Sequence, residues 1–203
     1  MPAASPDKPT HNARGRSTRE EILRAALRLI GERGIGATTH RAIAEAAGVP
    51  AGAPTYYFGT LDGLLREALL LFSREETERL QDLAAAVEQL DEPGDELLAE
   101  VFSRAVAETH VGTPTLVLAQ FELYLEAARS DEIRSAAAAC IEAYRNLATT
   151  VLRASGRRRA EEAAGRFVAM CDGLGLHQIA DPRRDYAAKV LKPALLDLLR
   201  CVD

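Results

Sequence analysis

The sequence predicts an all-α fold of about nine helices, and two observations lead to that prediction. Alanine, leucine, glutamate and arginine dominate the chain while β-branched residues are sparse, a composition that favours helices over strands. Apolar residues also recur three and four positions apart in most segments, which is the spacing of one helix face. Because 47% of the 203 residues are hydrophobic, the helices can bury a substantial core.

The first strong helical pattern covers residues 17–33. Ser17 or Thr18 can cap its start, and Gly34 follows its end, as glycine commonly does. The preceding residues 1–16 are rich in proline, alanine and polar residues, so they are predicted to be a disordered tail.

A second, short helix is predicted over residues 39–46, with Gly48 as its stop. The stretch that follows, residues 48–60, reads GVPAGAPTYYFGT and contains three glycines, two prolines and no charge. Such a composition is unusual in a chain of amphipathic helices. Thr60 can then cap a long helix that runs to about Leu90.

Five further helices are predicted after a break at DEPGDE. Pro114 suits the first turn of one of them, and Pro193 should kink the last. Their expected ranges are 94–109, 113–129, 131–154, 158–180 and 184–200.

Several classes of protein are excluded by what the sequence lacks. No apolar run approaches the roughly 20 residues of a membrane span, and the first residues have no apolar secretory region, so a cytoplasmic protein is expected. Cys140, Cys171 and Cys201 form no CxxC pair, so neither a metal site nor any cofactor is expected. The motifs GxSxG, HExxH, GxGxxG and the P-loop are absent, which argues against an enzyme.

Charge is distributed unevenly along the chain. Residues 1–59 hold eight Lys or Arg and five Asp or Glu, a net charge of +3, and because the whole chain carries −5 the remainder carries −8. A basic front end on an acidic body indicates that only the front end meets a polyanion.

Residues 42–58, AIAEAAGVPAGAPTYYF, have the sequence form of a helix-turn-helix, in which two short helices are joined by a glycine turn. The second helix of that motif enters the DNA major groove, and small side chains on its edge let it approach the bases. Thr55 can reach a base edge, while Tyr56 and Tyr57 can reach phosphates. The residues predicted to contact DNA are Arg19, Thr39, His40, Arg41, Ala51, Gly52, Ala53, Thr55, Tyr56, Tyr57 and Thr60.

The segment TTHRAIAEAAGVPAGAPTYYFGTLDGLLREAL resembles the DNA-binding domain of TetR-type (tetracycline-repressor-like) transcriptional regulators. Order, spacing and residue class agree over about residues 17–72. The resemblance implies a homodimer in which each chain has a three-helix DNA-binding head, here residues 17–59. It also implies a helical body, residues 60–203, that binds a small molecule and dimerises, often through its last two helices.

Two positions depart from the family pattern. Pro54 stands where a leucine or similar residue is usual, and a proline inside a helix costs about 3 kcal/mol. The cost is smaller near the helix start, so a short or late-starting recognition helix is predicted. Leu61 stands where the family often has a phosphate-contacting lysine, which leaves the backbone N–H groups near Thr60 to serve that phosphate.

The apolar faces of the last two helices are too broad for one chain to cover easily, so a two-fold four-helix interface is predicted. Its residues are Met170, Gly173, Leu174, His177, Leu191, Leu195 and Leu198.

An effector cavity is predicted among the central helices, and the apolar character of the body indicates a hydrophobic or aromatic effector. Its residues are Phe102, Val106, Leu116, Gln120, Phe121, Tyr124, Tyr144, Phe167, Met170 and Cys171.

The function predicted from the sequence is a ligand-responsive repressor that binds a palindromic operator in double-stranded DNA as a homodimer and is released by its effector. The alternative is a helical protein-interaction adaptor whose head no longer binds DNA, which Pro54 and Leu61 leave open. Phosphate contacts make binding fall steeply with salt, so a salt-dependent band shift separates the two.

Overall fold

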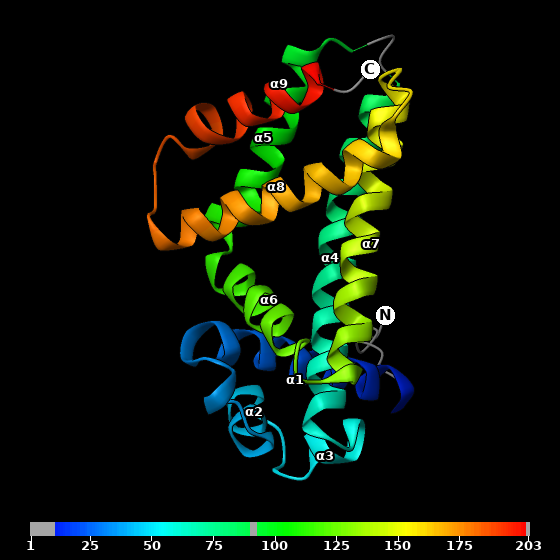
Figure 1. Cartoon of the computed structure of the whole chain (residues 1–203). Coiled ribbons are helices and arrows are strands. Elements are labelled where there is room, and N and C mark those ends of the chain that lie inside the picture. Colours follow the sequence, from blue (N-terminus) through cyan, green and yellow to red (C-terminus); the bar gives the residue numbers. More distant parts are fainter. Residues whose placement is uncertain (1–10, 90–92, 202–203) are drawn as a thin grey trace, which may run out of the picture.

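The computed structural model describes residues 11–89 and 93–201. Within those ranges it contains nine α-helices and no strand, which confirms the predicted all-α fold. Helices α1 (His11–Arg33), α2 (His40–Ala47) and α3 (Ala53–Phe58) form a head at one end of the molecule (Figure 1). The body consists of α4 (Leu61–Glu88), α5 (Asp95–Gly112), α6 (Pro114–Glu126), α7 (Asp131–Ala154), α8 (Ala160–Ala180) and α9 (Lys192–Arg200).

The body is organised around α4 and α7, which pack side by side along its length (Figure 1). α4 starts beside α3 in the head and runs up to the far end, so it belongs to both parts of the molecule. α6 lies over α1, and α8 packs against α7 and α5. None of the helices in the described ranges is long and apolar enough to cross a bilayer.

Helix α1 begins at His11, six residues before the predicted start at Ser17. The prediction of disorder over residues 1–16 is therefore wrong for 11–16, and its remaining part, 1–10, lies outside the described residues. Ser17 and Thr18 lie inside the helix and do not cap it. No proline stands between Pro9 and Pro50, so nothing prevents the helix from extending towards the N-terminus.

The predicted caps at the two helix starts are confirmed. The Thr39 side chain accepts a hydrogen bond from the Ala42 N–H, and the Thr60 side chain accepts one from the Gly63 N–H. Gly48 ends α2 in the left-handed region, with φ of 66°, where glycine carries no steric penalty. The caps and this glycine fix where the head helices start and stop.

The last helical segment is interrupted near Pro193. A π-helical turn, Ala187–Leu191, precedes α9, and the Lys192 N–H donates to the Ala187 carbonyl. Proline has no N–H to continue a regular ladder of hydrogen bonds, and here the irregularity takes the form of a π-turn that ends two residues before the proline. This turn places α9 against α5.

Buried apolar side chains form two cores. The first joins residues of α1, α2, α4, α6 and α7, and the second joins residues of α4, α5, α7, α8 and α9. The first core is continuous across the predicted domain boundary between residues 59 and 60, since Leu64, Leu65 and Leu69 pack with Ile22 and Ile30. The head is therefore packed directly onto the base of the body.

Polar contacts reinforce the junction of head and body. The Ile35 N–H donates to a Glu122 carboxylate oxygen at 2.5 Å, and at the base of the body the Ser130 hydroxyl donates to Asp62 in the first turn of α4 at 2.7 Å. At Gly31 the backbone of α1 comes so close to α6 that a Cβ atom would lie 1.9 Å from the Thr115 carbonyl oxygen. A displacement of α4 or α6 would therefore also displace the head helices that pack against them.

Candidate DNA-binding and effector sites

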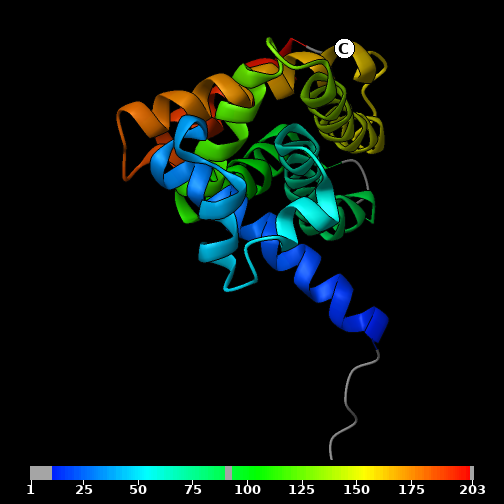
Figure 2. The same cartoon turned by 90° about the horizontal axis from the view of Figure 1, so that it is seen from below.

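The tip of the head presents α2, α3 and the turn between them, and Figure 2 looks at this end of the molecule. α3 spans six residues and has Pro54 in its first turn, so the predicted short, late-starting helix is confirmed. Pro54 is itself buried. Its missing N–H costs little because the first N–H groups of a helix have no intrahelical partner.

An uncharged, exposed edge runs along the turn and α3. Ala51, Gly52 and Thr55 are exposed, and Tyr56 is 83% exposed. An exposed fraction of that size is high for a large aromatic side chain, which normally contributes its area to a core or an interface. Arg41 is also exposed and adds a positive charge beside this edge.

The neighbouring predicted residues lie partly inside the head. Tyr57 is half-buried, packs against the first core and meets the Tyr56 ring edge-on, with ring centroids 5.2 Å apart. Ala53 also packs against that core. His40 is half-buried and its Nδ1 atom lies 3.5 Å from the Thr55 hydroxyl, a contact that links the two helices of the motif. Thr39 and Thr60 are exposed helix caps.

Arg19 has partners within the protein. Its guanidinium donates to Glu67 at 2.8 Å and lies over the Phe58 ring, 5.0 Å from the ring centroid. This side chain joins α1, α3 and α4 and keeps 41% of its area exposed, so its contact with DNA stays a prediction, and that contact would compete with the Glu67 ion pair. Phe58 is half-buried against the first core.

A cavity of about 90 Å³ lies among α4, α5, α6, α7 and α8 in the middle of the body. Six of the predicted effector residues line it, and they come from four helices. These are Phe102, Val106, Gln120, Tyr144, Phe167 and Cys171. The Phe102 and Phe167 rings meet edge-on, with centroids 6.0 Å apart, and form an aromatic wall.

Four other predicted effector residues lie outside the cavity wall. Leu116 and Tyr124 pack against the first core, and Met170 packs against the second. The Tyr124 hydroxyl accepts from Gln120 at 2.8 Å and donates to the Cys140 sulfur at 3.1 Å. Phe121 packs edge-on against Tyr124. Helical spacing predicted inward positions for all four residues. Their side chains pack against other side chains of the protein and do not line the cavity.

Sequence reasoning missed three polar residues of the cavity wall, Glu76, Thr109 and His110. Glu76 stands four positions after Phe72, and His110 four positions after Val106, so each continues an apolar stripe. A polar residue at a stripe position was the signal that could have found them. Asp172, which also lines the cavity, follows the same pattern after Val168.

Burial controls the charge of the ionisable groups at this cavity. It raises the pKa of Asp172 from its ordinary value of 3.8 to about 6. Burial also lowers the pKa of His110 to about 4, and the Glu76 carboxylate only partly opposes that shift. The His110 Nδ1 atom lies 2.9 Å from the Tyr186 hydroxyl. At neutral pH the cavity therefore holds an uncharged imidazole and an ionised Asp172.

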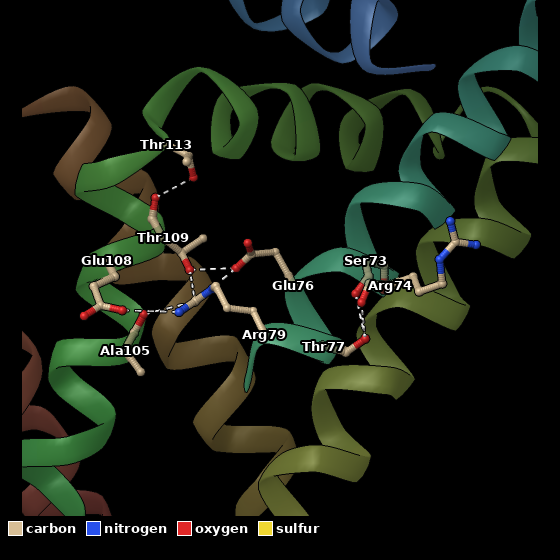
Figure 3. A network of polar contacts seen from close by, with 9 residues as sticks. All are labelled: Ser73, Arg74, Glu76, Thr77, Arg79, Ala105, Glu108, Thr109 and Thr113. Carbon is tan, nitrogen blue, oxygen red and sulfur yellow. Dashed lines mark hydrogen bonds and ion pairs between the residues drawn. The ribbon is translucent and has the colours of Figure 1, made fainter. Parts of the chain in front are cut away.

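Glu76 belongs to a polar network that joins α4 to α5 (Figure 3). The Thr109 hydroxyl donates to Glu76 at 2.7 Å, and Arg79 donates to the same carboxylate at 3.2 Å. Arg79 also donates to the Thr109 hydroxyl, to the Ala105 carbonyl at 3.2 Å and to Glu108 at 3.4 Å. The negative charge of Glu76 is thus compensated by protein groups.

The predicted dimer residues divide into three groups by their exposure. Leu191 and Leu195 are 0% and 1% exposed within the single chain, so the prediction that they face a partner is wrong. The π-turn and α9 pack these side chains against the chain's own α5. Gly173 and His177 are exposed on α8. The remaining three, Met170, Leu174 and Leu198, are half-buried.

Comparison with known proteins agrees with this architecture. Residues 22–68 match the model of bacterial regulatory proteins of the tetR family, and residues 93–200 match that of the tetracyclin repressor-like C-terminal domain. The regulator PksA of Bacillus subtilis (strain 168) is 31% identical over 82% of this chain and 80% of its own length. The regulator BetI of Brucella melitensis is 30% identical over 85% of each. A structure of the multidrug binding protein EbrR complexed with ethidium superposes with a TM-score of 0.71 at 28% identity, covering 92% of this chain and 99% of EbrR.

The fold and the exposed helix-turn-helix define a DNA-binding transcriptional regulator, a class that is not enzymatic. The chain belongs to the TetR family.

Proposed function

We propose that this regulator is a cytoplasmic repressor that binds a palindromic operator as a homodimer and leaves it when a small hydrophobic or aromatic effector enters the body. The observation that carries the proposal is the exposed, uncharged edge of α3 and its preceding turn at the tip of the head. A thin edge of alanine and glycine suits close approach to base pairs, and Thr55 can contact a base edge or a thymine methyl.

Homodimer formation is supported by the outer face of α8. Ala169, Gly173, Leu176 and Ala180 are exposed along one stripe of this helix, and Leu176 is 50% exposed. Small residues beside one leucine allow two copies of α8 to approach closely, and an isologous contact of this kind is the commonest in homo-oligomers. Two heads would then read half-sites about 34 Å apart, which requires a palindromic operator.

Effector binding is supported by the aromatic wall of the cavity and by similarity to EbrR, whose structures hold ethidium, malachite green and proflavin. At about 90 Å³ the cavity is smaller than the roughly 300–1,000 Å³ of typical ligand pockets. An effector of drug size must therefore displace wall side chains on α4, α5 and α8. Since α4 leads into the head, this displacement can change the spacing of the two heads, and a coupling of about 1–3 kcal/mol suffices to reduce occupancy 5- to 150-fold.

The proposal is tested by selecting bound fragments from random DNA with the purified full chain, followed by band shifts on the selected sequence. We expect a palindromic consensus, a complex of two chains per site and an affinity that falls steeply as salt rises. A protein-interaction adaptor would enrich no sequence, and that result would refute the proposal.

Tyr56→Ala is expected to weaken operator binding about tenfold while leaving the unfolding temperature within a degree or two, because the side chain is 83% exposed and supports no core. Leu125→Ala is the matched control, since Leu125 is also highly exposed, at 68%, but lies on α6 in the body. Equal operator affinities for the two variants, measured by fluorescence anisotropy, would remove Tyr56 from the interface.

A further inference from the structure

The ionisable groups that line the central cavity indicate the charge of its ligand, which the apolar side chains do not. We propose that the effector is an organic cation and that Asp172 is the carboxylate that meets its positive charge. This inference rests on the proposed effector function of the cavity and adds the chemical class of the ligand.

The cavity wall carries negative charge and no permanent positive charge. Two carboxylates line it, Glu76 from α4 and Asp172 from α8, and no lysine or arginine does. The remaining basic group on the wall is His110, which burial keeps neutral at pH 7 and whose Nδ1 faces the Tyr186 hydroxyl. A cation entering the cavity would find no like charge on the wall to repel it.

The two carboxylates differ in how far the protein already satisfies them. Glu76 accepts from Thr109 at 2.7 Å and from Arg79 at 3.2 Å, as Figure 3 shows. Asp172 makes no hydrogen bond or ion pair with any residue in the described part of the chain, and burial alone, with no neighbouring hydrogen bond or charge, raises its pKa. Glu76 is therefore held by the protein, and Asp172 is the carboxylate left for a ligand.

An unpaired carboxylate in a largely apolar cavity costs free energy that a partner of opposite charge would recover. The surroundings of Asp172 include the Phe102, Tyr144 and Phe167 rings, which line the same cavity. Aromatic faces attract organic cations by several tenths to about 2 kcal/mol. A cavity lined by one unpaired carboxylate and three aromatic rings is thus suited to a protonated or quaternary ammonium with an apolar body, and an anion would be repelled.

The experiment compares two ligands that have the same shape and differ in charge. Phenyltrimethylammonium is a permanent cation, and tert-butylbenzene replaces its nitrogen by carbon. The dissociation constants of both are measured at pH 7.5 by titration of the full-length protein, and of its Asp172→Asn and Asp197→Asn variants. Asp197 is the matched control, because it is exposed on α9 and the substitution changes the net charge equally.

Wild-type protein is expected to bind the cation at least about tenfold more tightly than the neutral compound, a difference of about 1.4 kcal/mol. Asp172→Asn should abolish this preference and leave the affinity for tert-butylbenzene within about twofold, while Asp197→Asn changes neither. Glu76→Gln should retain the preference, because Arg79 already neutralises that carboxylate.

Equal binding of the two ligands by wild-type protein, loss of the preference in Glu76→Gln in place of Asp172→Asn, or binding of neither compound would overturn the inference. Operator release in a band shift separates this failure from that of the proposed function. If neutral aromatic compounds release the operator, the ligand-responsive repressor stands and only the cationic class of its effector is wrong. If the protein selects no operator, the proposed function fails, whatever the cavity binds.

Discussion

Gly31→Ala is expected to lower the free energy of unfolding by about 3 kcal/mol. The new Cβ would lie 1.9 Å from the Thr115 carbonyl oxygen and 2.7 Å from its Cγ2, so α1 and α6 must separate. Alanine in a helix gains about 1 kcal/mol over glycine. The clash outweighs this gain because one of the two atoms belongs to the backbone and cannot rotate away.

Urea unfolding followed by circular dichroism, at a fixed protein concentration, measures this difference. Gly112→Ala is the control, since Gly112 ends α5 and has no atom within 4 Å of an added Cβ. We expect the control to match the wild type or exceed it slightly. If Gly31→Ala behaved like Gly112→Ala, the close approach of head and body at this point would be disproved.

Asp172→Asn is expected to raise the free energy of unfolding by about 3 kcal/mol at pH 7.5 and to leave it nearly unchanged at pH 4. The Asp172 pKa is about 6 in the folded protein against an ordinary value of 3.8, and each pKa unit corresponds to about 1.4 kcal/mol. Between these two pH values the folded state binds more protons than the unfolded state. The contribution of Asp172 is therefore favourable at low pH and is lost as the pH rises through 6.

Protonation of His110 changes the free energy of unfolding in the opposite direction over nearly the same pH range. Its pKa is about 4 in the folded protein and ordinarily 6.5, so the unfolded state binds more protons between those values and acidification destabilises the fold. The two contributions roughly cancel in the wild type. Removing Asp172 exposes the effect of His110, and the variant should lose stability more steeply than the wild type between pH 6.5 and 4.

Chemical denaturation of wild type and variant at several pH values checks this prediction. The other titratable groups around Asp172 are Glu76, His110, Tyr124, Cys140, Tyr144 and Cys171. Burial raises the pKa of the tyrosines and cysteines among them, so they stay protonated throughout this range. A difference between the two proteins that did not vary with pH would show that Asp172 is not desolvated as described.

Local sequence signals predicted much of the head and of the helix order. The threonine caps at residues 39 and 60, the glycine stop at 48 and the short α3 behind Pro54 depend on interactions within a few residues. The chain's own pattern was therefore sufficient for them. The start of α1 was misplaced because a polar segment without proline can be helical or disordered, and short-range pattern does not decide between the two.

The cavity residues show what helical periodicity could not predict. Phe102 and Phe167 lie on different helices and were correctly assigned to one cavity, because both are large and face inward. Tyr124 and Leu116 face inward equally but meet the first core. Helical periodicity gives the direction of a side chain relative to its own axis, and it contains no information on which neighbouring helix that side chain reaches.

The sequence by itself determined the all-α class, the helix-turn-helix and its uncharged edge, because these follow from propensity, caps and glycine positions along the chain. The tertiary structure alone decided that Leu191 and Leu195 fill the chain's own core, that Arg19 is engaged within the head, and that Glu76 is neutralised while Asp172 is not. Each of these depends on which helices lie side by side. A long-range packing contact joins residues far apart in the chain, and no spacing within one helix records it.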